Sequence, residues 1–150
     1  MIRVVSIFPC TPDGVYLSRR SHRVAFPDMW QTPGGKIEPA ETQESAVIRE
    51  FEEETGISLD IGQLHYLGQS PVMVWHEIVP EGRSRDYQVY TYWVHLRENE
   101  VPQLIELEKQ GSWHLVPYAD LDALTSQSVP GLPPWFPELR EIGRQLSAQN

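Results

Sequence analysis

The stretch from Gly35 to Ile57 constrains the fold of this chain more than any other, because it joins a glycine turn to a highly charged helix. No Gly or Pro occurs between Thr42 and Thr55, and Gly56 follows them as a normal helix stop. The sequence therefore predicts a helix from Thr42 to Thr55, preceded by a tight turn.

Three glutamates of this helix recur at helical spacing. At 3.6 residues per turn, Glu50, Glu53 and Glu54 share one face. The apolar residues of the segment gather on another face; they are Val47, Ile48 and Phe51. Like charges at such spacings destabilise a helix by about 0.2–0.5 kcal/mol per pair, so the cluster favours a bound divalent cation. Oxygen ligands indicate Mg²⁺ or Mn²⁺. A solvated acidic face is the alternative interpretation of the three glutamates alone.

The spacing of the whole stretch resembles the signature of the Nudix hydrolase superfamily. Nine positions carry the resemblance: Gly35, Glu41, Arg49, Glu50, Phe51, Glu53, Glu54, Gly56 and Ile57. The run from Trp30 to Lys36 is also similar to the Trp-x-x-Pro-Gly-Gly-Lys lead-in of many members. The resemblance implies an α/β fold, a mixed β-sheet sandwiched between helices, with residues 1–150 forming a single Nudix hydrolase domain.

A metal site on the helix follows from this resemblance. Glu50 and Glu53 are the strongest candidate ligands for Mg²⁺ or Mn²⁺, and Glu54 and the carbonyl oxygen of Gly35 are further candidates. Glycine at position 35 allows a tight turn and the close approach of a ligand. Such a metal lowers the pKa of attacking water and neutralises charge at phosphorus, where substitution depends more on electrostatics than on covalent chemistry.

The remaining catalytic candidates carry roles that the resemblance implies. Glu41 and Arg49 are expected to be mainly structural, with Arg49 orienting a catalytic glutamate through an ion pair. The general base is either Glu53 or a glutamate just upstream of the Trp113 strand, and that glutamate could instead be an extra metal ligand. Glu108 is the candidate there and Glu106 is the alternative, and either one could instead be a solvated loop residue.

Four residues are candidates for substrate binding. Arg19 and Arg20 end a predicted strand and point to opposite faces of it, so one of them is placed to meet a phosphate or a base edge. A solvated strand end is the alternative. Trp30 is a candidate stacking residue, although most aromatic side chains at such spacings belong to the core. Lys36, next to the glycine turn, completes the set.

Composition narrows the classes of partner. The net charge of −9 argues against a general nucleic-acid or anionic-membrane binder and suits a protein that binds cations. Cys10 is the only cysteine, which excludes an intramolecular disulfide and indicates a buried, inert thiol. The N-terminus lacks a signal-peptide pattern, and no apolar run approaches a membrane span. We therefore expect a cytoplasmic protein, either a monomer or a homodimer.

The other elements are predicted from local patterns. Strands are expected at 2–8, 15–20, 87–96 and 112–117, extended segments at 57–61 and 64–78, an exposed hairpin tip at 80–86, an acidic loop at 98–111, and helices at 118–124 and 135–146.

Within the superfamily, the chain most resembles the MutT-type nucleoside triphosphate pyrophosphatases. The compact length, the Arg19-Arg20 pair and the Pro-Gly-Gly-Lys-Ile-Glu run carry this similarity. It implies hydrolysis of a (deoxy)nucleoside triphosphate to the monophosphate and pyrophosphate. The MutT-type group includes enzymes that act on oxidised deoxynucleotides.

Several alternatives stay open. One is a hydrolase of ADP-ribose, another sugar nucleotide or a dinucleoside polyphosphate. Met73 stands where some ADP-ribose enzymes carry a proline, and Trp75 where dinucleoside-polyphosphate enzymes often carry a tyrosine. A non-catalytic nucleotide sensor is a different class, disfavoured by the complete set of carboxylates. A diphosphate-lipid isomerase would require a catalytic cysteine, and Cys10 is poorly placed for that role.

Overall fold

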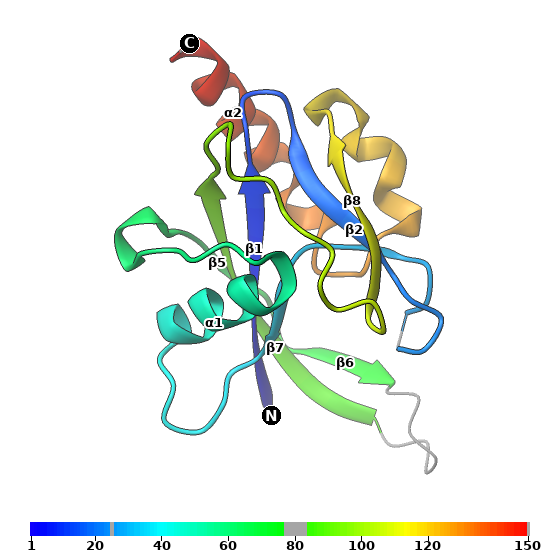
Figure 1. The fold of residues 1–150 in the computed structure, drawn as a ribbon. Coiled ribbons are helices and arrows are strands. Elements are labelled where there is room, and N and C mark those ends of the chain that lie inside the picture. Colours follow the sequence, from blue (N-terminus) through cyan, green and yellow to red (C-terminus); the bar gives the residue numbers. More distant parts are fainter. Residues whose placement is uncertain (25, 77–83, 150) are drawn as a thin grey trace.

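The structure is a computed structural model, and it describes residues 1–24, 26–76 and 84–149. Within these residues eight strands form one mixed sheet (Figure 1). The strands are β1 (Ile2–Cys10), β2 (Val15–Arg20), β3 (Trp30–Gln31), β4 (Gly34–Lys36), β5 (His65–Gln69), β6 (Met73–His76), β7 (Ser84–His95) and β8 (Gln110–Val116). The α-helices are α1 (Gln43–Thr55) and α2 (Phe136–Ala148), and the 3₁₀ helices are η1 (Ile61–Gln63), η2 (Tyr118–Gln127) and η3 (Pro133–Trp135).

Strands β1 and β7 run parallel and side by side through the centre of the sheet (Figure 1). Strand β1 also pairs antiparallel with β2 and β4, and β2 pairs antiparallel with β3 and β8. Strands β5 and β6 pair antiparallel with β7. The combination of parallel and antiparallel pairs confirms the predicted mixed sheet.

The two faces of the sheet carry separate apolar cores. On β1, Val5 and Ile7 belong to the core beneath α1, whereas Phe8 and Cys10 belong to the core beneath α2. The α1 core also holds Ala46, Val47, Phe51, Leu59, Tyr90, Tyr92, Val94 and Leu96. Since successive side chains of a strand point to opposite faces, this division places α1 and α2 on opposite sides of the sheet. The predicted sandwich of a sheet between helices is confirmed.

Helix α1 ends where the sequence predicts and begins one residue later, with Thr42 as its N-cap. The side chain of Thr42 accepts a hydrogen bond from the amide of Ser45 at 3.1 Å, and the Ser45 hydroxyl accepts one from the Thr42 amide at 3.0 Å. This capping box satisfies two amides that the first turn would leave unpaired. At the other end, Gly56 adopts a left-handed conformation with φ of 78° and donates its amide to Glu52.

Some predicted boundaries need correction. Strand β1 extends to Cys10, and the strand expected at 112–117 begins at Gln110, because Gln110 pairs with Arg20 of β2. The segment expected to be extended at 57–61 lies outside the strands, and its last residue opens the 3₁₀ helix η1. The helix expected at 118–124 is a longer 3₁₀ helix, and the closing helix begins one residue late, at Phe136.

Part of the predicted hairpin tip, residues 80–83, lies outside the described residues, as do residues 77 and 78 of the second extended segment. Residues 84–86 belong to β7. Among the helices that the structure describes, none is long and apolar enough to span a bilayer.

Candidate active site

Strand β4 brings two glycines against the C-terminal half of α1. Its pairing with β1 aligns Gly34 with Ser6 and Gly35 with Val5. A Cβ on Gly34 would lie 2.2 Å from the Val5 carbonyl oxygen, and a Cβ on Gly35 would lie 2.3 Å from Oε1 of Glu50. Both positions therefore require glycine, the first for sheet pairing and the second to leave room for a carboxylate.

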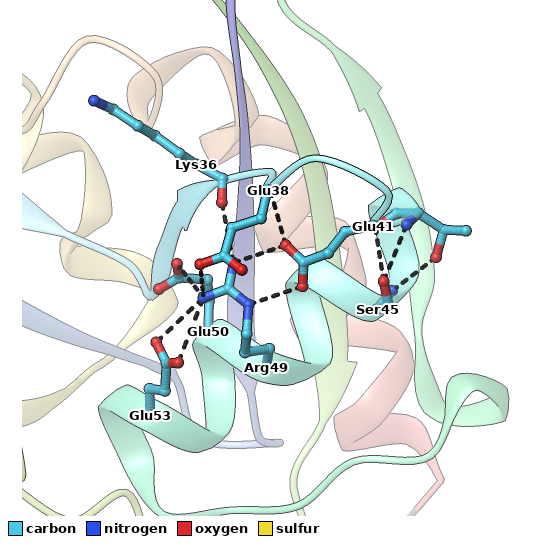
Figure 2. A network of polar contacts seen from close by, with 8 residues as sticks. Lys36, Glu38, Glu41, Ser45, Arg49, Glu50 and Glu53 are labelled. Carbon is cyan, nitrogen blue, oxygen red and sulfur yellow. Dashed lines mark hydrogen bonds and ion pairs between the residues drawn. The ribbon is translucent and has the colours of Figure 1, made fainter.

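Arg49 is the centre of a network of carboxylates (Figure 2). Its Nε and Nη2 donate to the two oxygens of Glu41 at 2.8 and 2.9 Å, a bidentate arrangement. Its Nη1 donates to Glu50 Oε1 at 3.0 Å and lies 3.3 Å from Glu53 Oε2. Nη2 also donates to the carbonyl oxygen of Lys36 at 3.1 Å. One guanidinium thus joins the glycine turn to Glu41, Glu50 and Glu53.

The network shifts the acidities of its members in opposite directions. Hydrogen bonds from Arg49 lower the pKa of Glu41, and the same contacts raise the pKa of Arg49. Burial raises the pKa of Glu50, although the contact with Arg49 offsets part of this change. Glu41 is therefore a firm anionic anchor, and Glu50 is an anion held in a partly desolvated place.

Glu54 is the most deeply buried carboxylate of α1. Its Oε2 accepts a hydrogen bond from the Gly34 amide at 2.8 Å. Burial raises its pKa well above the ordinary value, and the nearby charges of Glu50 and Glu106 act in the same direction. A cation near this group would stabilise its ionised form.

A second wall of the site comes from the loop between β7 and β8. The Gln103 amide donates to the Thr55 carbonyl at 2.9 Å, which holds this loop to the end of α1. Between α1 and the loop lies an open cleft of about 780 Å³, with Arg49 and Glu53 on the helix side and Ile105 and Glu106 on the loop side. Glu53 and Glu106 therefore border a space that a substrate can enter.

The two loop glutamates occupy different places. Oε2 of Glu106 lies 3.2 Å from the ammonium of Lys109, and Glu106 interacts electrostatically with Glu54. The side chain of Glu108 is exposed, and its carbonyl oxygen accepts a short hydrogen bond from the Ser21 hydroxyl. The alternative from the sequence, Glu106, is thus the one that joins the carboxylate cluster.

The structure also reveals Gln110, a residue that the sequence analysis did not select. Its side chain is buried, donates to the carbonyl oxygen of Glu54 at 3.2 Å, and accepts from the Ser18 hydroxyl at 3.0 Å. This bridge fixes the end of α1 to strands β2 and β8. Its role depends on the pairing of Gln110 with Arg20, which no local pattern indicates.

The substrate-binding candidates separate onto two faces. Arg20 lies on the α1 side, where its Nη1 donates to Gln31 at 2.8 Å and where burial lowers its pKa while Glu54 raises it. Arg19 is exposed on the other side, with its guanidinium 5.0 Å from the centre of the buried Trp30 ring. The predicted opposite orientation of the two arginines is confirmed.

Trp30 belongs to the α2-side core and makes an edge contact with His114, 5.3 Å between ring centres. The side chain of Lys36 is exposed and extends away from the Arg49 network (Figure 2). Of the four candidates, Arg20 is therefore the one beside the buried carboxylates.

The residues around Glu50 supply oxygen donors that could hold a divalent metal ion. In the described part of the chain, no three carboxylate, histidine or cysteine side chains form a ready-made metal cage. In this arrangement Arg49 contacts Glu50 and Glu53, while the Gly34 amide donates to Glu54. The donors are nevertheless carboxylate oxygens, and the missing Cβ of Gly35 lets the Glu50 carboxylate lie against the backbone of the glycine turn. This chemistry fits Mg²⁺ or Mn²⁺.

Comparison with known proteins agrees with this geometry. The family model described as NUDIX domain matches residues 2–139. An RNA pyrophosphohydrolase from Erythrobacter litoralis is 42% identical over 52 residues, which cover 35% of this chain and 30% of that protein. A CTP pyrophosphohydrolase from Escherichia coli is 35% identical over 63 residues, 42% of this chain and 47% of that protein.

The match with these two curated relatives therefore spans less than half of their length. A solved MutT protein from Bacillus halodurans superposes with a TM-score of 0.67 and 25% identity, covering 91% of this chain and 80% of that one. The similarity to the family thus extends through the sheet, the glycine turn and α1, and the chain belongs to the Nudix family.

Proposed function

We propose that this protein is a divalent-metal-dependent pyrophosphohydrolase that cleaves (deoxy)nucleoside triphosphates to the monophosphate and pyrophosphate. The observation that carries the proposal is the Arg49 network, which gathers Glu41, Glu50 and Glu53 beside the buried Glu54. The two relatives named as pyrophosphohydrolases support this reaction type. A non-catalytic sensor has no need of two desolvated carboxylates, Glu50 and Glu54, beside this network.

Glu50, Glu53 and Glu54, with the carbonyl oxygen of Gly35, would hold Mg²⁺ or Mn²⁺. When bound, such an ion supplies charge neutralisation and lowers the pKa of coordinated water. Arg49 keeps Glu50 and Glu53 oriented, and Glu41 anchors Arg49 from the opposite side. The site is thus held in place before substrate arrives, as catalysis by positioned charges requires.

In the proposed reaction, the oxygen of a water molecule forms a bond to phosphorus and the phosphoanhydride bond breaks. The bonding electrons leave with the released phosphate oxygen, and the water proton passes to a carboxylate base. Glu53 is one candidate base because it borders the cleft and is partly exposed. A loop glutamate, either Glu108 or the cluster member Glu106, is the other. Arg20 would bind substrate phosphate from the sheet side.

We further propose that the enzyme discriminates among nucleobases and that oxidised deoxynucleotides are among its possible substrates. Arg19, Trp30 and Lys36 are the remaining substrate-binding candidates. The proposed setting is a cytoplasmic monomer or homodimer that acts on small nucleotides and binds neither nucleic acid nor membrane.

Product analysis with purified protein and Mg²⁺ or Mn²⁺ tests the proposal. The panel contains canonical and oxidised dNTPs, ADP-ribose and diadenosine polyphosphates. We expect a nucleoside monophosphate and pyrophosphate from a triphosphate, with kcat/KM ranking the bases. Release of AMP and ribose phosphate from ADP-ribose, with triphosphates uncleaved, would assign the protein to the sugar-nucleotide branch instead. Tight binding of one nucleotide without turnover would indicate a sensor.

A further inference from the structure

Lys109, in the β7–β8 loop, has a backbone that is hydrogen-bonded at both its amide and its carbonyl. Its amide donates to the Glu106 carbonyl at 3.0 Å, and its own carbonyl accepts from the Ser21 amide at 2.9 Å. The next residue, Gln110, donates to the carbonyl oxygen of Glu54. The Cα of Lys109 is therefore held between β2 and α1, although 64% of its side chain is exposed.

The ammonium of Lys109 faces carboxylates from two elements. It lies 3.2 Å from Oε2 of Glu106, a buried oxygen that accepts no hydrogen bond from the described residues. Partial burial alone would lower the pKa of Lys109, but the contact with Glu106 and the charges of Glu50 and Glu54 raise it. Lys109 therefore places a positive charge near Glu50 and Glu54, two of the carboxylates that we assign to the metal.

Arg20, Arg49 and Lys109 all lie near these carboxylates, and Arg49 and Lys109 are held very differently. Arg49 makes a bidentate pair with Glu41 and further contacts with Glu50, and only 25% of its side chain is exposed. Among the described residues, Lys109 pairs with Glu106 alone, through a flexible and largely exposed side chain. The ammonium can move into solvent by changes of side-chain rotamer, whereas the guanidinium cannot leave without breaking the network.

We propose that Lys109 is an internal counter-ion, which neutralises the cluster of Glu50, Glu54 and Glu106 in the metal-free protein and withdraws when a divalent cation binds. The inference rests on the proposed function, because it assumes that Glu50 and Glu54 of this cluster are metal ligands. Its consequence is that Lys109 weakens metal affinity. When no metal is bound, the ammonium of Lys109 reduces the repulsion among the carboxylates. A metal ion must compete with this ammonium for the same carboxylates.

The test measures Mn²⁺ affinity directly, by electron paramagnetic resonance of free Mn²⁺ or by calorimetry, without substrate and at fixed ionic strength. Lys109→Met removes the charge and keeps the length of the side chain. We expect it to bind Mn²⁺ about fivefold more tightly than the natural protein, the order expected for loss of one partly exposed competing charge. Lys109→Arg, which restores the charge, should return the affinity to within about twofold of the original value.

Arg140→Met is the matched control for net charge. Arg140 pairs with Asp122 at 2.7 Å between α2 and η2, on the other side of the sheet. We expect it to leave the Mn²⁺ affinity within about twofold of the original, since exposed charges beyond a Debye length are screened. An equal gain in Mn²⁺ affinity in Arg140→Met and Lys109→Met would show that the effect comes from net charge alone, and it would overturn the inference.

Other outcomes are equally decisive. Unchanged or weaker Mn²⁺ binding by Lys109→Met would overturn the counter-ion role, and weaker binding of pyrophosphate by this variant would then assign Lys109 to the substrate. Should the natural protein bind no Mn²⁺ at all, the proposed metal site would fail together with this inference. A purely structural role of Lys109 predicts lost affinity, so the direction of the change separates the two explanations.

Discussion

At the scale of single residues, the site depends on where a side chain is absent as much as on where one is present. Gly35 has no Cβ, and the space thus left beside β4 is taken by the carboxylate of Glu50. Glu50 loses hydration at this buried position, and a hydrogen bond from Arg49 compensates for part of that loss. The glycine turn and the arginine therefore act together to place one carboxylate.

Gly35→Ala tests this arrangement. The new Cβ would lie 2.3 Å from Glu50 Oε1, so the carboxylate must move, while the backbone contacts of β4 are left unchanged. We expect kcat/KM to fall by about 100-fold, since misplacement of a catalytic group by about 1 Å has an effect of that order. The melting temperature should change little. Gly62→Ala is the control, because no described atom lies within 4 Å of the Cβ it would add.

Glu53→Gln tests the metal assignment. About half of this side chain is exposed, so removal of its charge should leave the fold intact. We expect kcat to fall by about 10²–10⁴-fold, the range for loss of an acid–base group or of a metal ligand. Circular dichroism reports the fold and steady-state turnover reports the rate. Normal Mg²⁺-dependent turnover would contradict the assignment, and Glu138→Gln on the exposed part of α2 serves as the control.

Cys10 illustrates the opposite case, a reactive group type made inert by its surroundings. Burial raises the pKa of its thiol to about 12, well above the value of 9.0 for a free thiol. The folded state thus favours the neutral thiol, so its contribution to stability is complete below pH 9 and is lost as the pH rises towards 12. We expect iodoacetamide to label Cys10 at pH 8 only after unfolding in denaturant. Rapid labelling of the native protein would contradict this.

At the scale of elements, α1 is positioned by its two ends and by one buried side-chain bridge. The capping box of Thr42 and Ser45 fixes the start of the helix, and Gly56 ends it. Gln110 then ties the last turn to β2 through Ser18. Because Glu50 and Glu54 lie in the final turns, a shift at this end would move the carboxylates directly.

Gln110→Leu should loosen that end of the helix. The substitution leaves the Glu54 carbonyl and the Ser18 hydroxyl without their partner in a buried place, which costs about 1–3 kcal/mol per unsatisfied group. We expect the free energy of unfolding in urea to fall by about 2 kcal/mol. Gln127→Leu, at an exposed position of η2, is the matched control. Equal stability of the two variants would show that the bridge contributes little.

The sequence predicted elements and residues whose cause is local. The helix from Thr42, its stop at Gly56 and the grouping of Glu50, Glu53 and Glu54 follow from spacing within one segment. The joining of Gln110 and Glu106 to this segment was beyond such reasoning, because it depends on the pairing of β2 with β8 and on the path of a long loop. Arg19 and Arg20 were placed on opposite faces, but only the tertiary structure shows which face carries Glu54.

At the scale of the whole molecule, the sheet separates an apolar core on one face from the face that carries the proposed active site. The α2 side is an apolar core closed by Phe136, Leu139 and Ile142, and the α1 side holds both a core and the carboxylate cluster. The net charge of −9 adds to the repulsion among these carboxylates. Like charges therefore remain close together at one place beside Arg49 and Lys109, and a bound divalent cation would reduce their repulsion.

This argument predicts that Mn²⁺ stabilises the entire fold. A ligand at 100 times its Kd that binds only the native state adds about 2.7 kcal/mol to the free energy of unfolding. For a chain of this size that corresponds to a rise in Tm of about 5–10 °C. Differential scanning calorimetry in Mn²⁺, compared with NaCl of equal ionic strength, measures the shift. Glu53→Gln should show a clearly smaller rise, because it has lost one candidate ligand. The same rise in Tm in both proteins would show that Glu53 is not a metal ligand. If Mn²⁺ raised the Tm of neither protein, the assignment of the metal site to α1 would be wrong.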